Sequence, residues 1–304
     1  MYLEFYGLKE EPFNLTPDSH FLFLSEQHRE ALSHLKYGIE QKKGFIALTG
    51  EVGSGKTTVC RSLLKMLDKK KYETALILNS FLSPVDLMET IAQDLGIDLS
   101  EHAKNEAFTG KKDTIGLYVD KLNKFLLDKE KEGKIVVLII DECQNLSFDV
   151  LEQIRMLSNL ETEKEKLLQI ILIGQPEFLD KLSSYELRQL NQRITVRSHL
   201  SPLKYKECRS YIMHRLKIAG SDGSIKFTEN AIKEIYKYCY GIPRRINIIC
   251  DYALIVGYVE ETRTINRSII KKALKEIDVK RKISLRQKMS ENSAFKGKVK
   301  RRVM

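Results

Sequence analysis

The sequence lacks any apolar run long enough to cross a bilayer, which takes about 18 consecutive apolar residues. Its longest apolar runs, such as 135–140, have only the length of a strand. Residues 1–6 also lack the basic segment and following apolar stretch of a secretory signal. We therefore expect a cytoplasmic protein without a transmembrane span.

Paired cysteines are missing as well. No CxxC motif joins the five scattered cysteines, which are Cys60, Cys143, Cys208, Cys239 and Cys250. An odd, unpatterned set of this kind indicates reduced thiols and argues against a disulfide framework or a zinc site.

Net positive charge is almost absent from the body of the chain, although the net charge of the whole chain is +10. Residues 280–304 contain ten Lys or Arg and one acidic residue, Glu291, so the rest of the chain is nearly neutral. A nearly neutral body argues against a large nucleic-acid footprint. The hydrophobic fraction of 42% is typical of globular proteins, so we expect a sizeable core.

Up to about residue 200, short apolar runs alternate with amphipathic helical patterns. The runs predict five strands, at 45–49, 74–79, 135–140, 169–174 and 195–200. Between them lie helical patterns at 57–67, 83–94, 112–128 and 149–160. This alternation predicts an α/β fold with a five-stranded parallel sheet and helices on both faces.

The strand signal disappears beyond Pro202. Four helices are predicted there, at 205–219, 228–240, 243–258 and 266–280. We therefore expect a nucleotide-binding α/β domain at 1–202, which includes an N-terminal linker segment at 1–30. A small all-α lid domain follows at 203–280, and a basic, disordered tail at 281–304.

A phosphate-binding loop lies between the first strand and the first helix. It consists of Gly50, Glu51, Val52, Gly53, Ser54, Gly55, Lys56, Thr57 and Thr58. At a helix N-terminus, unpaired N–H groups and the helix dipole favour an anion. In this motif Lys56 reaches the β- and γ-phosphates and the Thr57 hydroxyl is a ligand of Mg²⁺. The loop alone predicts binding of ATP or GTP with Mg²⁺, and we expect ATP.

Two carboxylates, Asp141 and Glu142, follow the apolar strand 135–140. Carboxylates at the end of a buried strand are costly unless a cation meets them. We expect Asp141 to hold Mg²⁺ through water and Glu142 to polarise the attacking water.

Further polar residues are placed to act on the phosphates. Gln175 directly follows a strand, so it is expected at the carboxyl edge of the sheet near the γ-phosphate. One of Arg188, Arg193 and Arg197 is a candidate arginine finger, which neutralises charge on the transferred phosphoryl group. Arg244 lies at the start of a lid helix, where positive charge is unfavourable unless a phosphate is near.

Together these motifs resemble an AAA+ ATPase of the general secretion pathway protein A family. The resemblance covers roughly residues 1–278 and lies in segments 6–8, 11–18, 21–24, 28–32, 49–58, 141–146, 173–177, 192–194, 199–200, 202–203 and 241–247.

The resemblance implies a P-loop NTPase of AAA+ type and a role for each matching residue. Lys56 and Thr57 match the Walker A pair, and Asp141 and Glu142 the Walker B pair. Gln175 matches sensor 1, Arg193 the trans-acting finger and Arg244 sensor 2. Pro12 and Phe13 are then expected near the adenine or in a plain linker. A finger supplied by a neighbouring subunit implies a homo-oligomeric ring.

Secretion members of the family continue into a transmembrane helix and a periplasmic, peptidoglycan-binding region, whereas this sequence ends in the basic tail, so neither cell-wall binding nor an envelope-spanning location is expected from it. Four expectations for the tail stay open: the cytoplasmic side of a lost membrane anchor, where Lys and Arg accumulate, contact with anionic lipid of the inner-membrane surface, contact with nucleic acid, or a solvated end. The leading hypothesis is an ATPase that remodels or assembles a protein partner in secretion or envelope machinery. The alternatives are a DNA-associated AAA+ protein, of transposition or origin-recognition type, and a nucleotide switch that hardly turns over.

Overall fold

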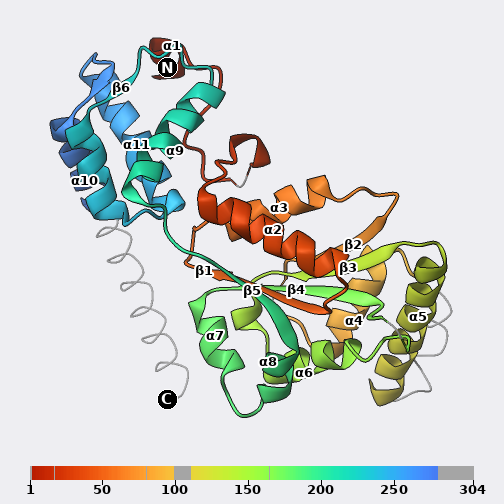
Figure 1. Cartoon of the computed structure of the whole chain (residues 1–304). Coiled ribbons are helices and arrows are strands. Elements are labelled where there is room, and N and C mark those ends of the chain that lie inside the picture. Colours follow the sequence, from red (N-terminus) through yellow and green to blue (C-terminus); the bar gives the residue numbers. More distant parts are fainter. Residues whose placement is uncertain (1, 17, 80, 99–110, 164, 280–304) are drawn as a thin grey trace, which may run out of the picture. The chain divides into compact units, whose positions relative to one another are not determined.

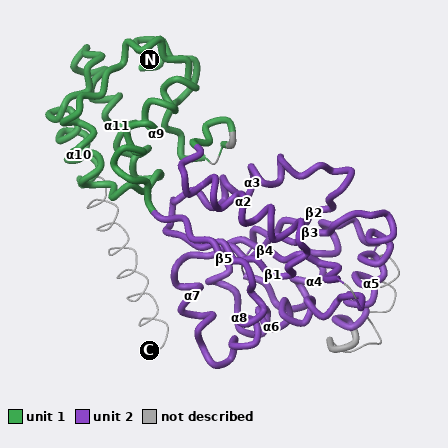
Figure 2. The backbone as a smooth tube through the Cα atoms, in the orientation of Figure 1, with its two compact units in different colours: residues 1–23, 202–304 green, residues 24–201 purple. Residues whose placement is uncertain are grey.

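A computed structural model describes residues 2–16, 18–79, 81–98, 111–163 and 165–279. The chain divides into two compact units, 24–201 and 1–23 with 202–304 (Figures 1 and 2). The predicted tail at 281–304 lies outside the described residues. Among those described, no helix combines the length and apolar character needed to cross a bilayer.

The larger unit is built on a five-stranded parallel sheet. Its strands are β1 (Phe45–Gly50), β2 (Tyr72–Ile77), β3 (Ile135–Ile140), β4 (Leu168–Gly174) and β5 (Ile194–Leu200). They lie in the order β2-β3-β4-β1-β5. This confirms the predicted α/β fold, with β2 beginning two residues earlier than expected.

The two faces of the sheet bury alternate side chains, as the two-residue period of a strand requires. Along β3, Val136, Leu138 and Ile140 belong to one core cluster and residues 135, 137 and 139 to the other. Burying each such side chain contributes about 1.5–3 kcal/mol relative to exposure. The sheet is therefore covered on both faces.

Helices α2 (Glu26–Glu40) and α3 (Lys56–Met66) cover one face. The other face carries α4 (Pro84–Asp94), α5 (Lys111–Lys131), α6 (Phe148–Leu157), α7 (Pro176–Leu182) and α8 (Arg188–Arg193) (Figure 1). A short 3₁₀ turn, η2 (Cys143–Asn145), follows β3.

Helices α2, α7 and α8 were not predicted from the sequence. Helix α2 begins inside the segment 1–30, which was treated as a linker, and its sequence signal was present. Ser25 caps it by accepting from the N–H of His28, and Ala31, Leu35 and Ile39 recur every four residues on its buried face.

The second unit is mainly helical. It contains α1 (Tyr2–Tyr6), the 3₁₀ turn η1 (Ser19–Phe21), α9 (Tyr205–Ile218), α10 (Glu229–Cys239), α11 (Pro243–Val259) and a last helix over 267–279. The expectation of no strands here was wrong in a small way. Two-residue strands β6 (Lys226–Phe227) and β7 (Thr264–Ile265) pair in parallel.

Residues 1–23 pack with this helical unit, not with the nucleotide-binding domain to which the sequence analysis assigned them. The physical reason is the burial of Tyr6, Phe13 and Phe21 in the core of the helical unit. The sequence alone could not decide which unit residues 1–23 join, because aromatic residues in a short irregular segment do not indicate which core they pack into.

A buried guanidinium fastens the segment 1–23 to α9. Arg215 donates from Nε to the carbonyl of Pro12 and from Nη2 to that of Asn14 at 3.3 Å. Its guanidinium also lies 4.6 Å from the centre of the Phe21 ring. Carbonyl oxygens and an aromatic face stabilise this cation, which is only 7% exposed.

Candidate functional site

The polar residues that follow β1, β3 and β4 meet at one edge of the sheet. Because β4 lies between β3 and β1 in the parallel order, the carboxyl ends of these strands are neighbours. Asp141 follows β3, Gln175 follows β4 and the phosphate-binding loop begins at Gly50 of β1. The fold thus brings together three predicted site segments that are far apart in the sequence.

The phosphate-binding loop leads from β1 directly into α3. Gly55 caps α3 with φ of 104°, a left-handed backbone conformation that residues other than glycine rarely adopt. A Cβ on Gly50 would lie 2.7 Å from the carbonyl oxygen of Leu200 on the neighbouring strand. Both glycines are therefore required by the backbone path.

Lys56 is folded back into this loop and is only 7% exposed. Its ammonium donates to the carbonyl of Gly50 at 2.7 Å and to that of Glu51 at 3.0 Å. Burial lowers the pKa of Lys56, although the nearby carboxylates of Glu142 and Asp141 act to raise it. A buried ammonium whose partners are neutral carbonyls is suited to receive an anion.

Thr57 and Asp141 meet across the site. The Thr57 hydroxyl donates to Asp141 Oδ2 at 3.0 Å, and the N–H of Glu142 donates to Asp141 Oδ1 at 2.8 Å. Burial raises the pKa of Asp141, and these two hydrogen bonds act to lower it. A hydroxyl oxygen beside a carboxylate is a donor set suited to Mg²⁺.

Glu142 is held by two amides. Gln144 Nε2 donates to Glu142 Oε2 at 2.6 Å and Gln175 Nε2 donates to the same oxygen at 3.0 Å. Burial acts to raise the pKa of Glu142, but these two bonds outweigh it, and the pKa lies below its ordinary value. Glu142 itself has a left-handed backbone, with φ of 54°, a conformation uncommon for residues other than glycine.

Gln144 is a site residue to which the sequence analysis gave no role. Besides donating to Glu142, it accepts the N–H of Gln175 at its Oε1, at 3.0 Å. It therefore links Glu142 to Gln175. The available signal was its place two residues after the carboxylate pair, on the same strand end.

Arg193, the candidate that matches the trans-acting finger, does not lie with the phosphate-binding loop. Arg193 precedes β5 at the amino edge of the sheet, where Ile194 pairs with Phe45. The loop begins after the opposite end of β1, on the order of 20 Å away along the strand.

The side chain of Arg193 binds the end of α6. Its guanidinium donates to the carbonyl of Arg155 at 3.2 Å, to Asn159 Oδ1 at 2.8 Å and to the Ser158 hydroxyl. Guanidinium groups are favourable at helix C-termini, where carbonyls lack intrahelical partners.

Arg188 and Arg197 are exposed and also have partners in their own chain. Arg188 stacks 4.1 Å from the centre of the Tyr185 ring. Arg197 donates to the backbone and side-chain oxygens of Asn191, both at 2.7 Å.

Arg244 belongs to the helical unit, where it is exposed in the first turn of α11. The turn before it depends on Gly241, with φ of 78°, because a Cβ there would lie 2.1 Å from the carbonyl oxygen of Leu203. The helix start that the sequence analysis inferred from Gly241 and Pro243 is therefore present.

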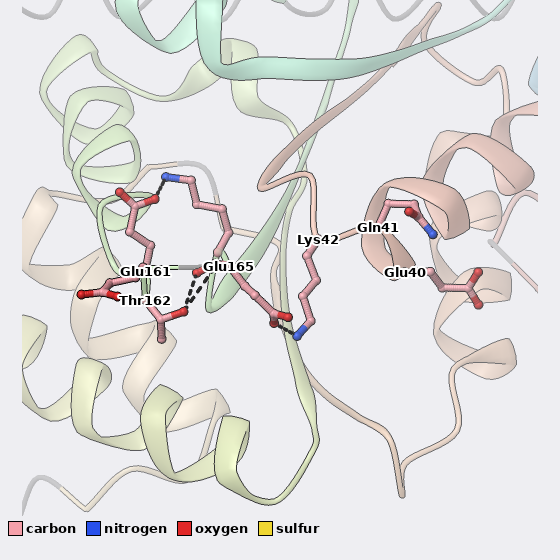
Figure 3. A pocket seen from close by; sticks show the side chains of 8 residues that line it. Glu40, Gln41, Lys42, Glu161, Thr162 and Glu165 are labelled. Atoms are coloured by element: carbon pink, nitrogen blue, oxygen red, sulfur yellow. Dashed lines mark hydrogen bonds and ion pairs between the residues drawn. The ribbon is translucent and has the colours of Figure 1, made fainter.

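A polar hollow of about 620 Å³ lies elsewhere on the larger unit (Figure 3). Its walls come from the end of α2 and from the segment before β4, and they include Glu40, Lys42, Glu161, Glu165 and Lys166. These segments lead into the amino ends of β1 and β4. The hollow therefore lies away from the phosphate-binding loop and is a poor fit for a triphosphate, since Glu residues outnumber Lys there.

The residues at the carboxyl edge fit a nucleotide triphosphate and Mg²⁺. The Ser54 hydroxyl in the loop is buried and has no hydrogen-bond partner among the described residues. The loop also contributes the ammonium of Lys56, and Thr57 with Asp141 supplies oxygen ligands.

Comparison with known proteins supports this interpretation. Residues 39–182 match the family model described as AAA domain. General secretion pathway protein A of Aeromonas hydrophila is 43% identical over 277 residues, which cover 91% of this chain. The chain is an AAA+ protein related to general secretion pathway protein A. It spans about half (48%) of the length of that relative.

Solved structures agree on the AAA+ fold. The Aeropyrum pernix ORC1 protein, determined in complex with DNA, is 17% identical with a TM-score of 0.64, covering 88% of this chain and 69% of that chain. The Walker-type ATPase of Pyrococcus abyssi is 19% identical with a TM-score of 0.59, covering 91% and 80%. At these identities the likeness concerns the fold alone, and it confirms the predicted fold class.

Proposed function

We propose that this protein hydrolyses ATP. The observation that carries the proposal is the meeting of Lys56, the Thr57–Asp141 pair and the Glu142–Gln175 pair at the carboxyl ends of β1, β3 and β4. Bound there by Thr57 and Asp141, Mg²⁺ would neutralise charge on the phosphates. Lys56 binds the β- and γ-phosphates, and the N–H groups of the loop orient them.

Glu142 is the residue that makes hydrolysis, and not only binding, the expected activity. Both amide donors occupy Oε2, which leaves Oε1 to accept a proton from the attacking water. Its lowered pKa keeps the carboxylate ionised at neutral pH. Gln175, which contacts Glu142 directly, is placed to sense the γ-phosphate.

Steady-state turnover of the wild type and of Glu142→Gln tests this assignment. The amide keeps the size and the polar contacts of the carboxylate but cannot take a proton, so we expect at least a hundredfold loss of kcat. ATP affinity should change little. Equal rates would remove Glu142 from the mechanism and favour a nucleotide switch that hardly turns over.

We further propose that the protein works as a homo-oligomer in which Arg193 acts on a neighbour's nucleotide. Arg193 is separated from its own loop by the length of a strand, so any direct action must be in trans. Reaching a neighbouring phosphate would require its guanidinium to leave the end of α6.

Mixing two inactive variants tests this arrangement. Arg193→Ala subunits bind ATP without a finger, and Lys56→Ala subunits supply a finger without binding ATP. A mixture should recover part of the activity. Failure of every mixing ratio would favour Arg188 or Arg197, or a finger-free monomer.

Arg244 is proposed to contact the nucleotide from the helical unit. Its neighbour Arg245 occupies the same exposed first turn of α11 and provides a matched control. Arg244→Ala should weaken ATP binding about tenfold, and Arg245→Ala should not. Equal effects of the two substitutions would point to general charge in place of a specific contact.

For the biological role we propose remodelling or assembly of a protein partner in secretion or envelope machinery, by a cytoplasmic ATPase at the inner-membrane surface. The support is the identity with general secretion pathway protein A. Adjacent secretion or pilus genes, and a secretion defect in a strain carrying Glu142→Gln, would support this role. Normal secretion in that strain would contradict it.

A DNA-associated role is the second candidate, because residues 280–304 carry ten basic residues. If it is correct, DNA binding should weaken steeply with salt and vanish when 281–304 are deleted. Loss of binding to anionic vesicles on the same deletion, with no DNA binding, would instead support a membrane-surface role for the tail.

A further inference from the structure

His28 connects the first turn of α2 to the phosphate-binding loop. Its Nδ1 lies 2.6 Å from the Ser25 hydroxyl and its Nε2 lies 3.3 Å from the carbonyl oxygen of Ser54. His28 is 5% exposed, Ser25 3% and Ser54 2%. The contact is therefore shielded from water at both ends of the imidazole.

The chemistry of these partners fixes where one hydrogen lies. A carbonyl oxygen can only accept, so Nε2 must carry the hydrogen that it donates to Ser54. Ser25 Oγ already accepts from the N–H of His28 at 3.2 Å. Its own hydrogen is free to go to Nδ1, and the neutral Nε2–H tautomer satisfies all these groups together.

The imidazole also occupies the space beside Gly55. A Cβ on Gly55 would lie 2.9 Å from His28 Nε2. The backbone of the phosphate-binding loop at Gly55 therefore packs closely against the edge of the His28 ring. Gly55 is excluded from carrying a side chain by this contact as well as by its left-handed backbone.

The hydrogen bond from His28 to the Ser54 carbonyl also fixes the direction of the next N–H group in the loop. The carbonyl of Ser54 and the N–H of Gly55 belong to one trans peptide plane and point in opposite directions. With the carbonyl drawn toward His28, the Gly55 N–H must point away from α2. Such N–H groups are the donors that a phosphate-binding loop offers to a phosphate.

We infer that His28 is a positioning residue of the nucleotide site, which fixes the Ser54–Gly55 peptide so that its N–H faces the phosphates. This inference rests on the proposed ATP site. None of the site residues predicted from the sequence lies on α2, so His28 gives this helix a role in the nucleotide site. Ser25 orients the ring from the other side and also caps the helix.

Substitution of His28 by Gln and by Asn separates positioning from packing. The amide nitrogen of Gln can occupy the place of Nε2 and donate to Ser54, whereas that of Asn reaches only the place of Nδ1. His34→Gln, on the same helix, is the matched control. The measured quantities are the Kd for ADP by titration calorimetry and, for ATP turnover, KM and kcat.

We expect His28→Asn to bind ADP about tenfold more weakly than the wild type and His28→Gln to stay within about threefold. KM should rise in the Asn variant with kcat nearly unchanged, because a ground-state contact is lost. The His34→Gln control should match the wild type. Melting temperatures without nucleotide should be similar for the Asn and Gln variants.

Equal ADP affinities of the Asn and Gln variants would overturn the inference. If His28→Asn does not fold, Ser25→Gly is tested in its place. Glycine keeps most of the helix cap but removes the hydroxyl that contacts His28 Nδ1. An ADP affinity equal to that of the wild type in Ser25→Gly would also overturn the inference. A wild type that binds no nucleotide would instead refute the proposed function. The two failures are therefore distinguishable.

Discussion

Charged side chains have different partners at the carboxyl edge and at the amino edge of the same sheet. At the carboxyl edge, Lys56 and Glu142 form hydrogen bonds with neutral groups, namely carbonyls and amides. At the amino edge, Lys42 is paired with Glu165 and Lys166 with Glu161 (Figure 3). Arg193 is the exception at the amino edge, because its hydrogen bonds go to neutral oxygens at the end of α6.

This difference separates residues that serve a ligand from residues that serve the fold. A charge held by neutral donors and acceptors remains able to attract an opposite charge from outside, whereas a paired surface charge is already compensated. Burial of these charges is unfavourable, and the pKa values reflect it. Burial raises the pKa of Asp141 and lowers the pKa of Lys56. The following substitutions test the contrast.

The largest effect is expected at Lys56. Lys56→Ala removes the only loop side chain that contributes a positive charge to the phosphates, so affinity for ATP should fall by about a hundredfold or more. Titration calorimetry measures this loss. Lys42→Ala removes a lysine of the opposite edge and is the matched control, for which wild-type affinity is expected.

Gln144→Leu should have an intermediate effect. Loss of one of two donors to the Glu142 carboxylate destabilises its charged form and raises its pKa. The acid limb of the pH profile of kcat should then move to higher pH, and kcat near neutral pH should fall about tenfold. An unchanged profile with an unchanged kcat would show that Gln144 does not act through Glu142.

A smaller effect, on stability, is expected at Arg193. Arg193→Met leaves the end of α6 without its donors and should lower the free energy of unfolding by about 1–2 kcal/mol. Urea denaturation measures it. ATP affinity of the variant should stay at the wild-type value, and a loss as large as that of Lys56→Ala would place Arg193 at its own chain's nucleotide.

The smallest effect is expected at the exposed ion pairs of the amino edge. Glu165→Gln breaks the pair with Lys42, whose side chain is 32% exposed. Surface pairs contribute about 0–1 kcal/mol, so neither the melting temperature nor turnover should change measurably. A clear loss of activity would give the polar hollow a function that its charge pairing does not suggest.

The fold and the chemistry of the site could be predicted because their signals are local. Continuous apolar runs such as 135–140 identify buried parallel strands, and a loop from Gly50 to Thr57 between a strand and a helix has few alternatives. A parallel topology then places the carboxyl ends of these strands at one edge of the sheet. For this reason Asp141, Glu142 and Gln175 were predicted near one another before any geometry was known.

The remaining features depend on tertiary contacts that leave no local signal. Nothing in the sequence around Arg193 indicates that its guanidinium binds the end of α6. His28 and Gln144 are polar residues of ordinary appearance, and their roles arise from partners 26 and 31 residues away. Residues 1–23 likewise reveal their place only through tertiary contacts, namely the burial of Tyr6, Phe13 and Phe21 and the hydrogen bonds of Arg215.

The most direct test of this account is calorimetric titration of the Glu142→Gln protein with ATP in the presence of Mg²⁺. We predict binding that survives this substitution, weakens on removal of Mg²⁺ and is lost when Lys56→Ala is added. Absence of binding, or binding that is indifferent to Lys56, would contradict the assignment of the carboxyl edge as the nucleotide site.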